Sequence, residues 1–125
     1  MSSYQISAFS QIYIFLFIPI VVSIIYWFSS SDLNVIERIL SSAHGLIFFM
    51  ASLFAVFISE YTETGDSSFS SFIFLFIIVL GVISVIYSFL KYPNSNLVHL
   101  LHFPNLICAF FIFFIGAMTI AHDWI

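Results

Sequence analysis

The chain has 125 residues, of which two are Lys or Arg, six are Asp or Glu and four are His, and 62% are hydrophobic. Only 6% are charged, whereas about a quarter of the residues in an ordinary soluble domain are charged. This composition excludes a water-soluble fold, and without a Lys/Arg cluster it also excludes a nucleic-acid-binding protein.

Four uncharged stretches follow one another along the chain, at residues 1–31, 39–59, 67–90 and 92–122. Each reaches the length of about 20 residues that is needed to cross a hydrocarbon core of roughly 30 Å. Backbone groups in lipid must be paired internally, and these stretches lack the alternation of barrel strands, so we expect helices. The sequence therefore predicts an all-α integral membrane protein, a four-transmembrane-helix bundle in contact with the lipid bilayer.

We expect one transmembrane domain over residues 1–125, with helices near 6–28, 35–60, 69–90 and 97–122. Asn34 precedes Glu37 by three residues, which is typical of the cap of a helix, here the second. Rows of small residues, such as Ala51, Ala55 and Ser59, favour close helix packing and hence a compact bundle.

Two short segments of the first helix recur about 60 residues later. Residues 14–18 (IFLFI) recur as 73–77, and 23–28 (SIIYWF) resemble 84–89 (SVIYSF). A genuine repeat would make the chain two tandem helical hairpins related by an axis along the membrane normal. The alternative is chance, because a chain with 18 phenylalanines repeats short segments easily.

The two basic residues indicate an orientation in the membrane. Arg38 and Lys91 fall on the same side as the 28–34 and 91–96 loops if the chain crosses four times. The positive-inside rule then places both termini on the outer or intermembrane side of a bacterial or mitochondrial inner membrane.

Three histidines are the candidate site residues, since ionisable groups at membrane depth are costly and usually functional. His44 lies about ten residues into the second helix, and His99 and His102 share one face early in the fourth. The second and fourth helices run in the same direction, so we expect all three histidines toward the Arg38 side. Histidines from neighbouring helices could ligate a b-type haem, and a histidine could hydrogen-bond a quinone carbonyl.

An alternative assignment follows from Pro104, because proline suits the first turn of a helix. The fourth helix would then begin near Phe103. In that case His99 and His102 would lie at the membrane edge, with solvent or backbone partners and without a cofactor.

Motifs of catalysis are missing from the sequence: there is no metalloprotease His–Glu spacing, no nucleophile elbow and no glycine-rich phosphate loop. We therefore expect a non-catalytic small membrane subunit that packs with other membrane-protein subunits in a larger assembly, for which an energy-transducing complex would be a natural host. One alternative is a redox anchor that binds b-type haem or quinone through His44 and His102, with His99 nearby. Another is a self-associating channel or membrane effector.

Overall fold

The computed structural model describes residues 3–29, 34–62, 68–91 and 100–122. These residues form four long helices and one short helix: α1 (Ser3–Ser29), α2 (Val35–Ser42), α3 (His44–Thr62), α4 (Ser68–Lys91) and α6 (His102–Ala121). The four long helices are each long and apolar enough to cross a membrane. The prediction of an all-α, four-helix membrane bundle is confirmed.

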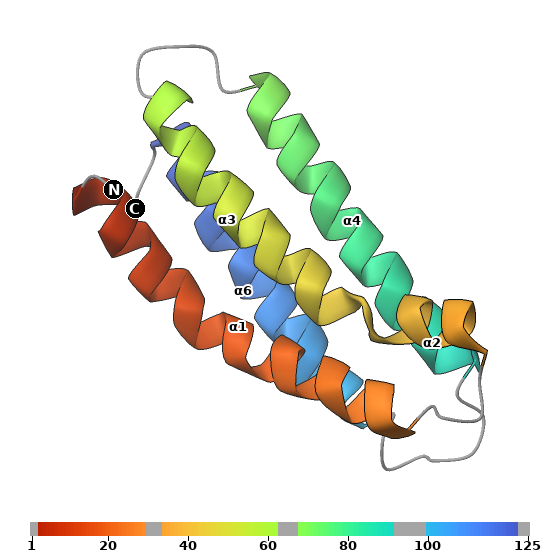
Figure 1. The fold of residues 1–125 in the computed structure, drawn as a ribbon. Coiled ribbons are helices and arrows are strands. Elements are labelled where there is room, and N and C mark those ends of the chain that lie inside the picture. The colour runs from red at the N-terminus through yellow and green to blue at the C-terminus, as the bar shows by residue number, and fades with distance from the viewer. Residues whose placement is uncertain (1–2, 30–33, 63–67, 92–99, 123–125) are drawn as a thin grey trace.

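Neighbouring spans alternate in direction, so the start of α1 and the end of α6 lie at one end of the bundle and α2 lies at the other (Figure 1). We call these the terminal end and the α2 end. Helices α1 and α4 each pack against both α3 and α6, and α3 also contacts α6. The end of α1, the start of α3, the end of α4 and the start of α6 therefore come together at the α2 end.

Apolar side chains from all four spans fill the middle of the bundle, among them the fully buried Ile12, Phe48, Phe74 and Ile112. Two of these rings lie directly against glycines of neighbouring helices. A Cβ atom added at Gly81 would lie 2.9 Å from Cδ1 of Phe48, and one added at Gly116 would lie 2.9 Å from Cε2 of Phe74. Small residues thus allow close helix contact, as expected where no hydrophobic force drives association in lipid.

The predicted 35–60 helix is divided at Ala43 into α2 and α3. Just before the division, the Ser41 and Ser42 hydroxyls donate to the carbonyls of Glu37 and Arg38, both at 2.7 Å. Serine hydroxyls that bond to the carbonyl four residues earlier compete with the backbone and bend helices. The uncharged stretch 39–59 continues across Ala43, so the pattern of charge and hydrophobicity alone could not predict the bend.

Serines from the two flanking helices bond to backbone groups at the α2–α3 break. The Gly45 N–H donates to Ser23 Oγ of α1 at 2.7 Å, and Ser84 Oγ of α4 donates to the Leu40 carbonyl at 2.6 Å. An unpaired backbone group in lipid costs several kcal/mol, so a break at membrane depth requires such partners. A Cβ atom at Gly45 would lie 2.6 Å from the Pro19 carbonyl oxygen, and glycine is therefore needed here.

Helix α2 has the character of an interfacial helix. The Asn34 cap is confirmed, because Asn34 Oδ1 accepts from the Glu37 N–H at 2.9 Å. Arg38 donates from Nε to the Trp27 carbonyl at 2.7 Å and lies 4.0 Å above the Trp27 ring. Val35 and Ile36 are exposed, which suits a helix whose apolar face contacts the membrane boundary.

The fourth span also differs from its predicted bounds. Helix α6 begins at His102, with Leu100 and Leu101 in a turn and Pro104 in its first helical turn. This start agrees with the alternative based on proline. The expectation that His102 would then have solvent or backbone partners is wrong, because His102 is buried and bonds to the side chains of Tyr26 and Ser88. Residues 97–99 lie outside the described residues.

The short repeats do not mark equivalent packing positions. Leu16 is 2% exposed, but its counterpart Leu75 is 43% exposed. Likewise, Tyr26 is fully buried and Tyr87 only half-buried. The tandem-hairpin origin of the chain therefore stays a prediction that the packing does not strengthen.

We predict that Ser23→Ala and Ser84→Ala each lower the free energy of unfolding by about 1–2 kcal/mol, because each leaves a backbone group at the break without its partner. Reversible unfolding in mixed SDS and dodecyl maltoside micelles, followed by circular dichroism, measures the effect. Ser10→Ala is the matched control, since the exposed Ser10 hydroxyl bonds, among the described residues, to the Ser7 carbonyl of its own helix. Losses no larger than that of the control would contradict this role for the two serines.

Candidate functional site

Five buried polar side chains converge at the α2 end: Tyr26 of α1, His44 of α3, Ser88 of α4, and His102 and Asn105 of α6. Each is at most 5% exposed. We call them the His44–His102 cluster. All four spans contribute to it, and polar residues at membrane depth are usually functional because their burial is costly.

A hydrogen-bonded group surrounds His102 Nε2. The Tyr26 Oη atom lies 2.5 Å from this nitrogen, and Ser88 Oγ lies 3.2 Å from it. Ser88 donates its own proton to the Val85 carbonyl at 2.8 Å, so toward His102 its oxygen is an acceptor. This arrangement favours the His102 tautomer with a proton on Nε2, shared between the Tyr26 and Ser88 oxygens.

The rings of Tyr26, His44 and His102 form a compact triangle. Tyr26 stacks on His102 with centroids 4.9 Å apart and meets His44 edge-on at 5.9 Å. The two imidazole centroids are 6.2 Å apart, at an interplanar angle of 70°. The structure thus brings together two of the three predicted histidines, whereas His99 lies outside the described residues.

His44 and Asn105 are buried without hydrogen bonds of good geometry. Within the described part of the chain, no hydrogen bond of good geometry reaches either ring nitrogen of His44 or either amide atom of Asn105, and both residues are fully buried. The His44 ring has only a poorly aligned contact with the Ser41 backbone. Leaving a buried polar group unpaired costs about 1–3 kcal/mol. Such groups in a folded protein call for an explanation, and a bound ligand or water is the usual one.

The terminal end provides a contrast, because its buried polar side chains bond to backbone carbonyls. Tyr4 also stacks on His122 with centroids 4.5 Å apart. The donors are Tyr4 Oη to Thr119, Gln5 Nε2 to Val56, Thr62 Oγ1 to Ile120 and His122 Nε2 to Ser59, at 2.6–3.1 Å. These contacts tie α1, α3 and α6 together and have a structural role, so the two polar ends of the bundle differ in kind.

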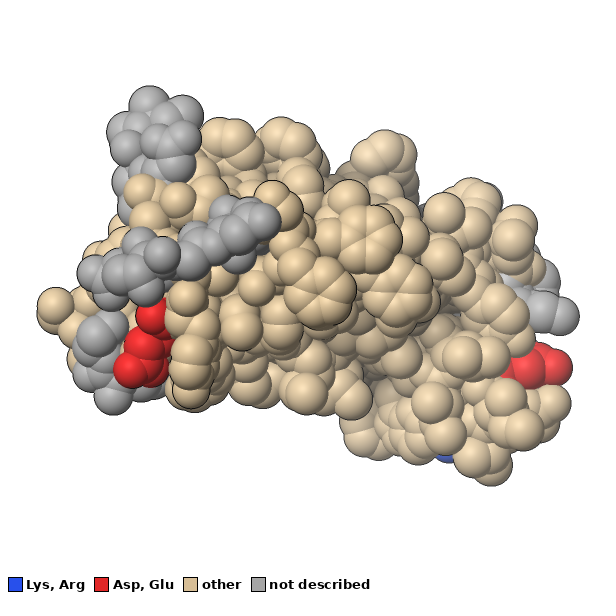
Figure 2. Space-filling view, turned by 90° about the horizontal axis from the view of Figure 1, so that it is seen from above, with Lys and Arg blue, Asp and Glu red and all other residues tan. Residues whose placement is uncertain are grey.

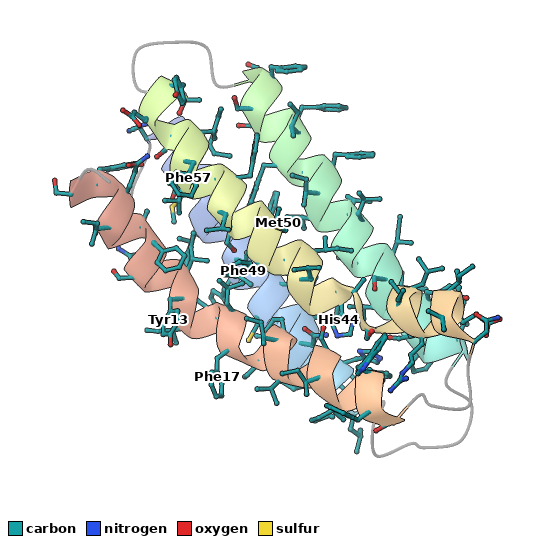
Figure 3. All side chains as sticks on the ribbon, viewed as in Figure 1. Tyr13, Phe17, His44, Phe49, Met50 and Phe57 are labelled. Atoms are coloured by element: carbon teal, nitrogen blue, oxygen red, sulfur yellow. The ribbon has the colours of Figure 1, made fainter. Side chains whose placement is uncertain are left out.

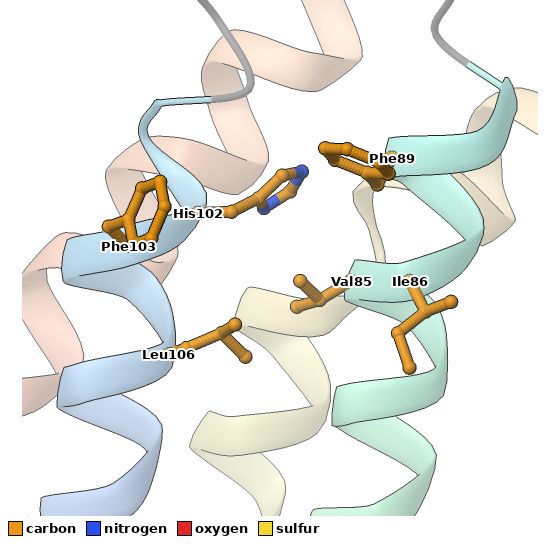
Figure 4. A pocket seen from close by; sticks show the side chains of 6 residues that line it. All are labelled: Val85, Ile86, Phe89, His102, Phe103 and Leu106. Carbon is orange, nitrogen blue, oxygen red and sulfur yellow. The ribbon is translucent and has the colours of Figure 1, made fainter.

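An apolar pocket of about 210 Å³ lies beside the His44–His102 cluster, between α4 and α6 (Figure 4). Its walls are Val85, Ile86 and Phe89 on α4 and His102, Phe103 and Leu106 on α6. Phe89 is 54% exposed and Phe103 is 69% exposed. The pocket therefore faces outward, toward lipid, and His102 is its polar side chain.

A haem between the two histidines does not fit this packing. Tyr26 contacts both imidazole rings, so a macrocycle placed between them would have to displace the Tyr26 side chain and its bond to His102. A metal site is not supported either, since no three His, Cys, Asp or Glu residues among the described ones could hold an ion. A small neutral ligand that accepts or donates hydrogen bonds suits the site better.

Tyr26 and Asn105 are two residues of the cluster that the sequence analysis did not identify. A signal for Tyr26 was present. The residues Ile12, Leu16, Pro19 and Val22 precede it at helical spacing on the buried face of α1, and continuing this stripe places Tyr26 inside the bundle.

No protein-family model, no curated protein and no solved structure matches this chain. Inferences about its function therefore depend on the geometry of the molecule itself.

We predict opposite effects on stability for two cluster variants. Tyr26→Phe removes a bond to His102 and should lower the free energy of unfolding by about 1–2 kcal/mol. His44→Leu removes two buried nitrogens without partners at similar side-chain volume, so stability should stay the same or rise. Unfolding in mixed micelles measures both, and a His44→Leu loss as large as that of Tyr26→Phe would show that His44 is a structural residue.

Proposed function

We propose that this chain is a non-catalytic small membrane subunit that packs with other subunits in a larger membrane assembly. The observation that carries the proposal is the share of each span left outside the core. Only 28–44% of the residues in the four spans are buried within the bundle. The residues of the spans that are not buried include large side chains such as Tyr13 and Phe17, which point away from the bundle (Figure 3). His44, by contrast, lies inside the bundle near the α2 end.

The surface of the molecule supports the same proposal. Acidic side chains show only near the two ends of the face in view, and the long surface between them carries none (Figure 2). In the described ranges, the chain outside the spans amounts to α2, the ends of the helices and short turns. This leaves little described surface in water for a soluble substrate, so interactions within the membrane are the natural role.

The charges at the α2 end suggest the orientation. Arg38 lies in α2, at the end opposite the start of α1 and the end of α6. By the positive-inside rule, we place the α2 end inside and both termini on the outer or intermembrane side of a bacterial or mitochondrial inner membrane. An energy-transducing complex is the host that we favour for such a subunit.

A second candidate function is favoured by the His44–His102 cluster: a redox anchor that binds a quinone. Histidine and asparagine N–H groups are suitable donors to the carbonyls of a quinone head group. The cluster combines such donors with an apolar pocket that faces lipid, which is the usual make-up of a small-molecule site. Because a haem does not fit, quinone is the cofactor that we retain.

The channel alternative receives less support. The apolar layer formed by Ile12, Phe48, Phe74 and Ile112 separates the polar groups of the two ends, and a conducting path needs polar lining or a hydrated gap. A pore within a single bundle is therefore not proposed, and a pore formed by several copies stays a prediction.

We predict that photo-crosslinking amino acids at Phe17 and Phe57, both exposed, form adducts with other membrane proteins in native membranes. The same group at the buried Ile12 should crosslink only within the chain.

Blue native electrophoresis in digitonin should show the chain in a species larger than a monomer. Migration as a lone monomer together with adducts to lipid alone would contradict the assembly.

For the quinone site, we predict that the chain in lipid nanodiscs binds a short-chain quinone and that His44→Leu, which should not lower stability, weakens binding at least about ten-fold, or about 1.4 kcal/mol. Equilibrium binding with extraction and optical detection of the quinone measures the affinity. The control is Ser10→Ala, at the opposite end of α1. Equal binding by the wild type and His44→Leu would remove the cluster as the head-group site.

A further inference from the structure

A second cavity extends the pocket along the same two helices. This cavity, of about 270 Å³, is lined by Leu75, Ile78, Val82, Leu106, Ala109, Phe110 and Phe113. Leu106 lines both cavities. Together they form one path along the α4–α6 seam, which we call the α4–α6 groove.

The groove has a direction. On α6 its lining runs from His102 to Phe113, which at 1.5 Å per residue is on the order of 16 Å along the helix axis. His102 at the start is polar and connects to the His44–His102 cluster, and the remaining lining consists of apolar side chains. A ligand that matches this gradient has a polar head group at the α2 end and an apolar tail directed toward the middle of the membrane.

The residues around the polar end of the α4–α6 groove favour a ligand with a neutral head group. Among the side chains that the structure describes, the groove lining contains no Lys or Arg, and the guanidinium of Arg38 in α2 bonds to the Trp27 carbonyl of α1. A phosphate or carboxylate would therefore have no counter-charge among these described lining residues, and burying an unpaired charge is strongly unfavourable. A carbonyl head group, by contrast, needs no counter-charge. The donors that it would use are His44 and Asn105, which are fully buried and line neither cavity, so the head group must pass His102 to reach them.

We propose that the α4–α6 groove is the tail site and the lateral entrance for a single-tailed, lipid-soluble quinone whose head group reaches the His44–His102 cluster. The ligand enters from the bilayer between Phe89 of α4 and Phe103 of α6, the exposed side chains that flank His102. Its tail then lies over Ala109, the smallest residue of the lining. This inference rests on the quinone-binding function and adds the tail and the route.

The test compares two quinones with the same head group, one without a tail and one with a ten-carbon tail. Binding is measured to the full chain in phosphatidylcholine nanodiscs, with ligand concentrations expressed per lipid so that partition into the bilayer cancels. We expect the wild type to bind the tailed quinone at least about ten-fold more tightly, since the tail is buried against apolar surface.

A blocking variant identifies the tail site. Val82→Phe places a larger side chain in the groove wall, whereas Val79→Phe makes the same change at an exposed position of α4 outside the lining. Val82→Phe should abolish the advantage of the tail and leave affinity for the tailless quinone within about two-fold. Val79→Phe should leave both affinities unchanged, and retained binding of the tailless quinone shows that each variant is folded.

The possible failures are distinguishable. If both quinones bind the wild type equally, or if Val82→Phe leaves the tail advantage intact, the groove is not the tail site although the quinone function survives. If neither quinone binds, the quinone function fails and this inference fails with it. Should decanol, which has a ten-carbon tail and no quinone head group, displace the tailed quinone at the same concentration per lipid, the groove is an ordinary site for lipid chains and the proposal is overturned.

A photoreactive group on the tail gives an independent measurement. We expect adducts on the α6 peptide that contains Ala109 and Phe113, with competition by the unmodified tailed quinone. Adducts confined to other helices would overturn the proposed route even if both quinones bind.

Discussion

Internal pairing of backbone groups in lipid is the constraint on which this structure depends. The chain breaks its helix between α2 and α3, and two serines, Ser23 and Ser84, bond to the backbone on either side of the break. Because the partners come from α1 and α4, both helices must lie beside the start of α3. The two serine–backbone hydrogen bonds therefore fix how α1, α3 and α4 are arranged at the α2 end.

The same two serines also position the candidate site. Tyr26 follows Ser23 by three residues and Ser88 follows Ser84 by four, so each site residue lies one helical turn beyond its serine. Both approach His102 Nε2 from opposite helices. The α2–α3 break and the His44–His102 cluster are thus structurally coupled, and a substitution at the break should change the geometry of the cluster.

The sequence predicted the fold well because length and lack of charge decide membrane spans almost by themselves. It also predicted the Asn34 cap and the placement of His44 and His102 toward the same end of the bundle as Arg38. It could not predict the α2–α3 break, because that break depends on hydroxyls from other helices. Nor could composition show which polar groups remain unpaired, since that is a property of packing, as His44 illustrates.

The glycine contacts of two phenylalanines have a mechanical consequence. Phe48 of α3 rests on Gly81 of α4, and Phe74 of α4 rests on Gly116 of α6. A helix that slid along its axis would drive each ring into a larger neighbouring side chain, and packed interiors resist such strain. Helix α4 is thereby locked in axial register against both α3 and α6, so the seam on its outer side can widen by side-chain rotation but not by sliding of the helices.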